Sequence, residues 1–119
     1  MNMKKIPVIL DGDPGHDDAI AWTLAASSPG LDILAVTTVA GNVSLDKTSL
    51  NSRKIWTLLG KDVKIARGAV KPLFTEHIDA PSVHGESGLD GPDLPDPVME
   101  LHELGAVDLM AQILQEAVE

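Results

Sequence analysis

Apolar and polar positions divide the first half of the chain into short apolar runs and amphipathic stretches. Residues 6–11 form an apolar run that predicts a short buried strand, and 32–40 are β-branched and nearly continuous in apolarity, which is typical of a strand buried on both faces. Residues 18–28 and 46–59 have the composition and spacing of helices, and 62–66 predict a third strand. Strand, helix and strand in succession indicate parallel strands joined by a right-handed crossover. We therefore expect an α/β, Rossmann-like fold with a mostly parallel sheet flanked by helices.

The two helices of this half carry signals at their ends. We expect Asp17 or Asp18 to cap the first helix, where a carboxylate also meets the positive end of the helix dipole. We expect Gly60 to end the second helix. The apolar side of the second helix is predicted to consist of Leu50, Ile55, Leu58 and Leu59.

The chain changes character after the third predicted strand. Residues 67–103 are rich in proline, glycine and acidic residues, which predicts a long loop region of the kind that often binds ligands. Residues 106–119 predict a last helix, which ends without a cap and with Glu116 and Glu119 at its negative dipole end. We interpret this ending as a chain cut short of its domain boundary. The apolar face of this helix is predicted to consist of Val107, Met110, Ala111, Leu114 and Val118.

Composition narrows the possible partners. The length of 119 residues suits one domain, and 9 basic against 18 acidic residues argue against nucleic acid or an anionic membrane as a partner. The chain has no cysteine, which excludes disulfides, thiolate metal sites and cysteine nucleophiles and is compatible with the cytoplasm, the location we expect. The apolar run before Asp11 is too short for a signal peptide, and no stretch approaches membrane-spanning length.

Four aspartates lie within eight positions directly after the first predicted strand, in Asp11-Gly-Asp13-Pro-Gly-His-Asp17-Asp18. Carboxylates this close repel one another unless a positive charge lies between them, and a hard divalent cation with oxygen ligands is the neutraliser we expect. Asn42 follows the second predicted strand. Ligands of open parallel sheets bind at the carboxyl ends of strands, so both segments should meet at one edge of the sheet.

Simpler interpretations of the same residues stay open at this point. The aspartates could form a solvated turn and a helix cap, and Asn42 could be an ordinary turn residue. His84 could be an exposed loop histidine. We interpret the other three histidines, His16, His77 and His102, as surface or loop residues.

Three segments resemble one known family. The run from Asp11 to Ala19 resembles the Asp-x-Asp-Pro-Gly-x-Asp-Asp-Ala signature of the nucleoside hydrolases of the inosine–uridine-preferring type. Residues 37–42, Thr-Thr-Val-Ala-Gly-Asn, and 84–89, His-Gly-Glu-Ser-Gly-Leu, resemble two later segments of that family. The resemblance implies that residues 1–119 are the N-terminal portion of one longer nucleoside hydrolase domain, with 67–103 as an active-site loop region.

The resemblance also implies an activity and roles for particular residues. The reaction would be hydrolysis of the N-glycosidic bond of a ribonucleoside to ribose and free base by a calcium-bound water. Asp13 would be a Ca²⁺ ligand and the general base, and Asp18 would be a second Ca²⁺ ligand. The other implied positions are Asp17 and Asn42 at the ribose hydroxyls, His84 near the ribose and base, and Asp11 behind the ligands, which it orients.

The same resemblance limits what the chain alone should do. Asp13 and a bidentate Asp18 supply about three of the 6–8 oxygens that calcium takes, and the family draws further ligands from downstream. We therefore expect negligible nucleosidase activity and weak calcium affinity from the 119 residues by themselves. For the full-length protein the resemblance implies a small ribonucleoside substrate and a homo-oligomer, either a dimer or a tetramer.

Two other functions remain to be distinguished. An apolar strand ending in Asp-x-Asp also opens the haloacid-dehalogenase-like phosphatases. In that family Asp11 would attack phosphorus and Asp13 would transfer protons, with magnesium as the metal. Pro14-Gly15 and the second acid pair fit that family poorly, and it leaves the segments around Asn42 and His84 unexplained. The other alternative is a non-catalytic fragment that serves only in an interaction.

Overall fold

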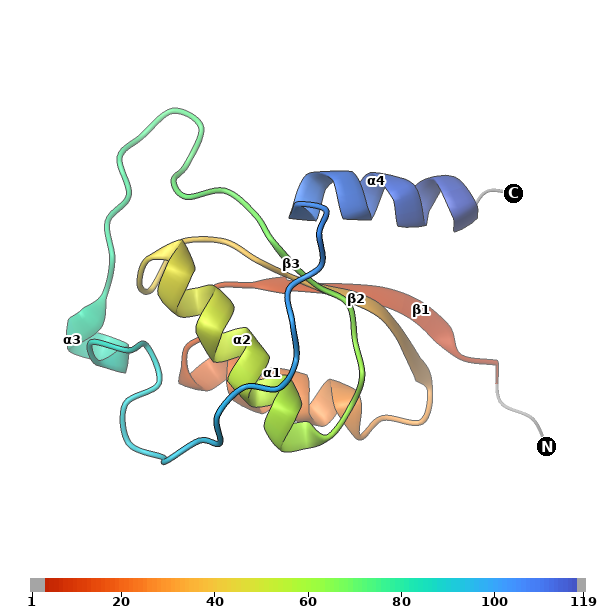
Figure 1. The fold of residues 1–119 in the computed structure, drawn as a ribbon, viewed down its shortest axis with the longest axis horizontal. Helices are drawn as coiled ribbons and strands as arrows, with labels where there is room; N and C mark the ends of the chain where they lie inside the picture. The colour runs from red at the N-terminus through yellow and green to blue at the C-terminus, as the bar shows by residue number, and fades with distance from the viewer. Residues whose placement is uncertain (1–3, 118–119) are drawn as a thin grey trace.

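The computed structural model describes residues 4–117, which form one parallel sheet with helices on both faces. Figure 1 shows α1 and α2 below the sheet and α4 above it. The predicted α/β class with a parallel sheet is confirmed. The elements in chain order are β1 (Ile6–Gly12), α1 (His16–Ala26), β2 (Leu31–Thr38), α2 (Leu45–Leu59), β3 (Ile65–Arg67), α3 (Pro81–His84) and α4 (Ala106–Ala117).

The sheet has the order β1-β2-β3, so the buried strand β2 lies in the middle. Its last residues, Ala35 to Thr38, are fully buried, as the continuous apolar run predicts. The register of β1 against β2 shifts once, between Val8 and Ile9, and then continues to the pair Gly12 and Thr38. Both strands therefore end at the same level, which brings the segments that follow them to one edge of the sheet.

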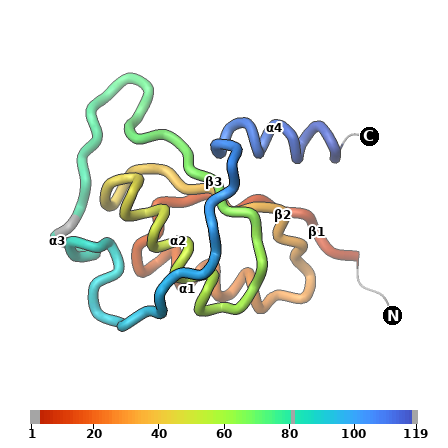
Figure 2. The backbone as a smooth tube through the Cα atoms, viewed as in Figure 1, coloured from red at the N-terminus to blue at the C-terminus, as the bar shows by residue number. Residues whose placement is uncertain are grey.

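The larger core lies between the sheet and the helices α1 and α2. Trp22 of α1 and Trp56 of α2 pack with their ring centroids 6.1 Å apart, next to Val36 of the central strand. Figure 2 follows the chain from α3 back past α1 and α2 before it rises to α4. Leu89 from this return segment is buried in the same core. The predicted loop region is thus anchored to the core.

The smaller core lies between α4 and the opposite face of the sheet. Ala35 and Ala66 present small side chains there, so the helix can approach the strands closely. Leu109 is fully buried against them, and Ala106 and Ile113 complete the contact. These residues lie on one helix face at spacings of three and four.

The structure contradicts the predicted cap at the start of α1 and confirms the predicted end of α2. Gly15 is the N-cap residue of α1, and no side chain caps this helix. The prediction that Asp17 or Asp18 caps it is wrong, because the helix begins at His16 and both carboxylates lie inside its first turn. They still lie near the positive end of the helix dipole. The predicted end of α2 at Gly60 is confirmed, with a left-handed φ of +67°.

The predicted apolar side of α2 is only half correct. Ile55 is buried and Leu59 partly buried, but Leu50 and Leu58 are 39% and 60% exposed. The buried face of α2 includes four polar residues instead: Thr48, Ser49, Asn51 and Ser52. Three of them hydrogen-bond neighbouring segments; Thr48 Oγ1, for example, donates to the carbonyl of Val39. Apolarity alone therefore identifies only part of the buried face of this helix.

The predicted apolar face of α4 is also wrong in part. Val107 and Leu114 are 74% and 61% exposed, and Ala111 is exposed too. Met110 is partly buried against the small core. The helix has two apolar stripes, and the one that contains Leu109 packs against the sheet. Val118 and Glu119 lie outside the described residues.

We predict that the two stripes of α4 contribute differently to stability. Leu109→Ala should lower the free energy of unfolding by about 2–5 kcal/mol because it leaves a cavity in the core. Val107→Ala, the matched control on the exposed stripe, should change it by less than about 0.5 kcal/mol. Urea denaturation followed by circular dichroism measures both values. An equal loss in the two variants would contradict this packing.

Candidate active site

The turn after β1 and the loop after β2 are joined through Asp13 and Asn42. The backbone N–H of Asn42 donates to Asp13 Oδ2 at 2.8 Å, and Asn42 Nδ2 donates to the carbonyl of Asp13 at 2.8 Å. Gly41 leaves room for this contact, since a Cβ there would overlap the Asp13 carboxylate. The two segments therefore meet at the carboxyl edge of the sheet, where parallel strands are expected to bring them.

Asp11 is fastened to the neighbouring strand. Thr37, its partner in the β1–β2 register, donates its hydroxyl to Asp11 Oδ1 at 2.5 Å. Asp11 is exposed, while Thr37 is fully buried. The contact fixes the side chain of Asp11 just before the turn that contains Asp13.

Asp18 is the strained carboxylate of this site. Its Oδ2 is buried and has no hydrogen-bond partner. Burial raises the pKa of Asp18 most, the charges of Asp17 and Asp13 raise it further, and a hydrogen bond from the backbone of Gly15 opposes the shift. A carboxylate in this position favours either a proton or a cation beside it.

Nothing in residues 4–117 forms a complete metal site. No group of three or more His, Cys, Asp or Glu side chains within that range is arranged to hold an ion. Asp13 and Asp18 nevertheless fit a hard cation as partial ligands. Both offer carboxylate oxygens, and the unpartnered oxygen and the raised pKa of Asp18 reflect negative charge that a cation would compensate.

His84 also lies at this site. The backbone N–H of His16 donates to His84 Nδ1 at 3.3 Å, and a Cβ on Gly15 would come within 2.7 Å of the same atom. The backbone N–H of Ala80, just before α3, donates to the carbonyl of Asn42 at 2.7 Å. The structure thus brings Asp13, Asn42 and His84 to one region, and Asp17 is exposed on the first turn of α1.

Three residues of this region were missed from the sequence. His16 and His77 are half-buried, and His77 Nε2 lies 2.8 Å from the carbonyl of Gly41. The interpretation of His16 as a surface or loop residue leaves out the contact of its ring with His84. Its place inside the aspartate run was the one available signal. Asn51 is buried on α2 and donates to carbonyls of two different loops, which no sequence pattern indicates.

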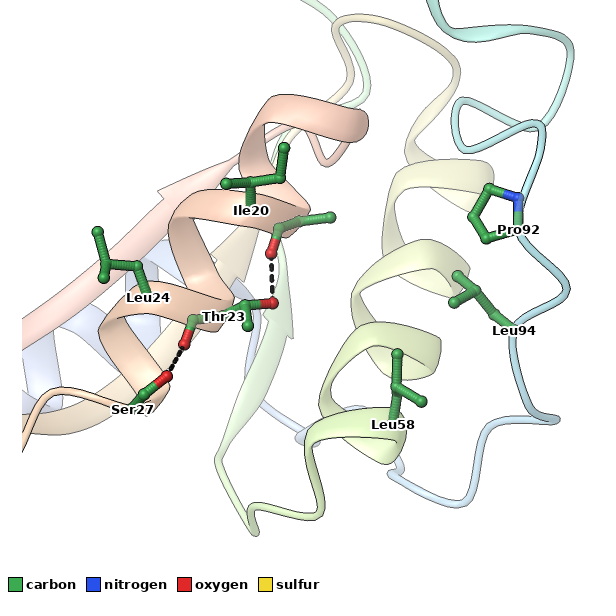
Figure 3. A pocket seen from close by; sticks show the side chains of 8 residues that line it. Ile20, Thr23, Leu24, Ser27, Leu58, Pro92 and Leu94 are labelled. Carbon is green, nitrogen blue, oxygen red and sulfur yellow. Dashed lines mark hydrogen bonds between the residues drawn. The ribbon is translucent and has the colours of Figure 1, made fainter.

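A groove of about 520 Å³ lies elsewhere, between α1 and α2. Figure 3 shows that its polar side chains, Thr23 and Ser27, donate to backbone carbonyls of their own helix. The groove therefore offers an apolar surface and no catalytic group. Its lining is Ala19, Ile20, Thr23, Leu24, Ser27, Leu58, Pro92 and Leu94.

Comparison with known proteins identifies the family. Residues 8–119 match the family described as inosine-uridine preferring nucleoside hydrolase. The chain belongs to this family. It is 57% identical over 114 residues to the pyrimidine-specific ribonucleoside hydrolase RihA of Photobacterium profundum. It is 53% identical over 115 residues to RihA of Escherichia coli O139:H28.

Solved structures of the family have the same fold. A purine-preferring ribonucleoside hydrolase from Gardnerella vaginalis superposes with a TM-score of 0.86 at 27% identity, over 93% of this chain and 37% of that one. The plant nucleoside hydrolase PpNRh1 gives a TM-score of 0.81 at 34% identity, over 92% and 36%. The two RihA matches cover 95% and 96% of this chain, which spans 37% of the length of each relative.

Family membership confirms the resemblance on which the site prediction was based. The match spans the aspartate run, Asn42 and the segment beginning at His84, and so favours a nucleoside hydrolase over a dehalogenase-like phosphatase. The roles assigned to the individual residues stay predictions. Within residues 4–117, no helix is both long and apolar enough to cross a membrane.

We predict that Asp18 destabilises the protein when no divalent cation is present. A carboxyl whose pKa is raised by folding contributes most below its unfolded pKa, and that contribution is lost as the pH rises through the folded pKa. In EDTA, Asp18→Asn should therefore lose less stability than the wild type as the pH rises from below 3.8, the ordinary pKa of an aspartate, to neutral. Thermal unfolding across this range measures the difference.

The exposed Asp32 of β2 provides a control with the same change of charge. Asp32→Asn should follow the wild-type pH profile. Identical profiles for Asp18→Asn and the wild type would show that Asp18 is not strained.

Proposed function

We propose that this chain supplies the calcium- and ribose-binding part of an active site that hydrolyses ribonucleosides to ribose and free base. The observation that carries the proposal is the junction of Asp13 and Asn42 through two hydrogen bonds, with the unpartnered carboxylate oxygen of Asp18 in the same aspartate run. Carboxylate and amide oxygens gathered at a sheet edge suit both a hard cation and the hydroxyls of a sugar.

In this proposal Asp13 and Asp18 hold Ca²⁺. When bound, the ion supplies positive charge that offsets the clustered carboxylates and lowers the pKa of a coordinated water. The two side chains provide about three of its 6–8 oxygen ligands, and the other ligands come from outside the 119 residues or from solvent and substrate.

The geometry of Asp13 suits a general base. Its Oδ2 accepts from the backbone of Asn42, which fixes the rotation of the carboxylate and leaves Oδ1 to take a proton from the attacking water. The Asn42 amide also binds the backbone of Asp13. The proposed general base Asp13 and the proposed sugar-binding residue Asn42 therefore keep one relative position. Such fixed placement lowers the entropic cost of reaching the reactive arrangement.

Asn42 and Asp17 are proposed to bind the ribose hydroxyls. Asn42 Nδ2 donates one of its two hydrogens to Asp13, and Asn42 Oδ1 is the atom proposed to accept from a hydroxyl. Asp17 is exposed on the first turn of α1 and can accept from a neighbouring hydroxyl. Negative charge beside the sugar also favours the oxocarbenium-like transition state of glycosidic cleavage. His84 would approach the ribose and base from the loop side.

A pyrimidine ribonucleoside is the substrate that the comparisons favour. The relatives that are 53–57% identical are both named pyrimidine-specific, whereas the Gardnerella hydrolase named purine-preferring is 27% identical. We extend the pyrimidine preference to the protein that carries this chain. A homo-oligomeric full-length form and a cytoplasmic location stay predictions.

We predict that this chain can replace the matching part of a relative. In a chimera with the remainder of Escherichia coli RihA, it should support calcium-dependent hydrolysis of uridine faster than of inosine. Asp13→Ala in that chimera should lower kcat by about 10²–10⁴-fold, the usual contribution of general acid–base catalysis.

Asp32→Ala, which removes an exposed carboxylate far along the sheet from the site, is the control and should leave kcat unchanged. An Asp13→Ala chimera as fast as its parent would overturn the proposed role of Asp13.

We predict that the 119 residues alone bind calcium weakly and turn over neither uridine nor inosine at a measurable rate. Isothermal titration should give a dissociation constant of about 10⁻⁴–10⁻³ M or weaker, the range of low-affinity calcium sites. Asp13→Ala should abolish this binding. Absence of calcium binding by the folded wild type would instead favour a non-catalytic interaction fragment.

A further inference from the structure

Residues 84–90, hereafter the histidine loop, form a closed unit. The backbone N–H of Asp90 donates to the carbonyl of His84 at 3.2 Å and closes the base of the loop. Inside it, the Asp90 carboxylate accepts from the Ser87 hydroxyl at 2.5 Å and from the backbone N–H groups of Glu86 and Ser87 at 3.2 Å. These hydrogen bonds, with that of the Ser87 side chain first, lower the pKa of Asp90. The loop is therefore held together by its own hydrogen bonds, with His84 at its start.

The middle of the histidine loop is anchored from α2. Asn51, only 3% exposed, donates through Nδ2 to the carbonyl of Ser87 at 2.7 Å and to that of Pro14 at 3.3 Å. Gly88 adopts a left-handed φ of +88°, and a Cβ there would lie 2.9 Å from Asn51 Nδ2. Leu89 is buried in the larger core. This anchor holds the loop body but does not touch the ring of His84.

His16 contacts both ends of the loop. Its Nε2 lies 2.8 Å from the carbonyl of Asp90, and since a carbonyl only accepts, Nε2 carries the proton. Its Nδ1 lies 3.2 Å from His84 Nδ1, with ring centroids 5.3 Å apart and planes tilted by 35°. The backbone N–H of His16 donates to His84 Nδ1, so that nitrogen is an acceptor, and the approach of the two Nδ1 atoms is a contact of the rings and not a second hydrogen bond. One side chain thus joins the closed base of the loop to the first turn of α1.

We propose that His16 is a positioning residue that holds the ring of His84 against the turn between β1 and α1. The position of His84 beside a ribose rests on the proposed function. The contacts of His16 with His84 and Asp90 do not depend on it. His16 and the proposed calcium ligand Asp18 lie in the same first turn of α1. His16 therefore links the helix turn that carries the proposed calcium ligand to the histidine loop.

The first test uses the unaltered 119-residue chain. Nitrogen-15 spectra of the imidazole rings should show the Nε2-protonated form of His16, together with nuclear Overhauser contacts between the rings of His16 and His84. An unprotonated Nε2, or the absence of ring contacts, would overturn the proposal. No calcium or nucleoside is present, so the result does not depend on the proposed activity.

The second test compares two variants. His16→Leu removes the donor to the carbonyl of Asp90. Amide hydrogen exchange in residues 84–90 should become about tenfold faster, because one hydrogen bond that opposes local opening of the loop is lost. The His84 ring resonances should move toward those of an unstructured histidine. His16→Gln keeps an amide donor and should restore most of the protection.

A distant histidine and the core tryptophans serve as controls. His102→Ala, in the segment before α4, should leave the His84 resonances unchanged. The indole signals of Trp22 and Trp56 report whether the core of each variant is intact. A folded His16→Leu chain with wild-type His84 resonances and loop exchange would overturn the proposal. If that variant fails to fold, the wild-type spectra still decide it.

Discussion

The double hydrogen bond between Asp13 and Asn42 is the interaction on which the proposed site depends. It joins the ends of β1 and β2 through one backbone N–H, one side-chain amide and two oxygens of a single residue. Both strands end at the same level because their parallel register pairs Gly12 with Thr38, so the junction needs only a short turn on each side. The absence of a Cβ at Gly41 lets the two segments approach.

The junction lies beside three further aspartates, Asp11, Asp17 and Asp18, and their carboxylates are compensated to different degrees. Asp11 is fastened by Thr37, and Asp13 by Asn42, so their carboxylates are already partly compensated by donors. Asp18 has no partner for its buried oxygen, and its pKa is raised. This residual imbalance costs stability in the protein alone, and it is the basis of the proposed affinity for a cation. Packing of the two cores around β2 offsets this cost.

The polar face of α2 connects this site to the loop region. A helix packed only by aliphatic side chains would leave the carbonyls of Pro14 and Ser87 without donors, whereas Asn51 provides one to each. Ser49 Oγ lies 3.1 Å from the hydroxyl of Thr38 at the end of the central strand. Polar residues of α2 therefore occupy buried positions where apolar ones would otherwise pack, and they position the segments that carry the proposed chemistry.

The sequence by itself determined the alternation of strands and helices, the parallel sheet, the family and the meeting of Asp13 with Asn42. These follow from the spacing of hydrophobic residues, from the succession of strand, helix and strand along the chain, and from a motif whose residues are adjacent in the chain. Only the tertiary structure decided which stripe of α4 packs, because Leu109 and Val107 are both apolar and the alanines of the sheet select between them. It also decided that His16 and Asn51 contact the histidine loop, since their partners lie 36 or more positions away and a hydrogen bond of that span leaves no local pattern.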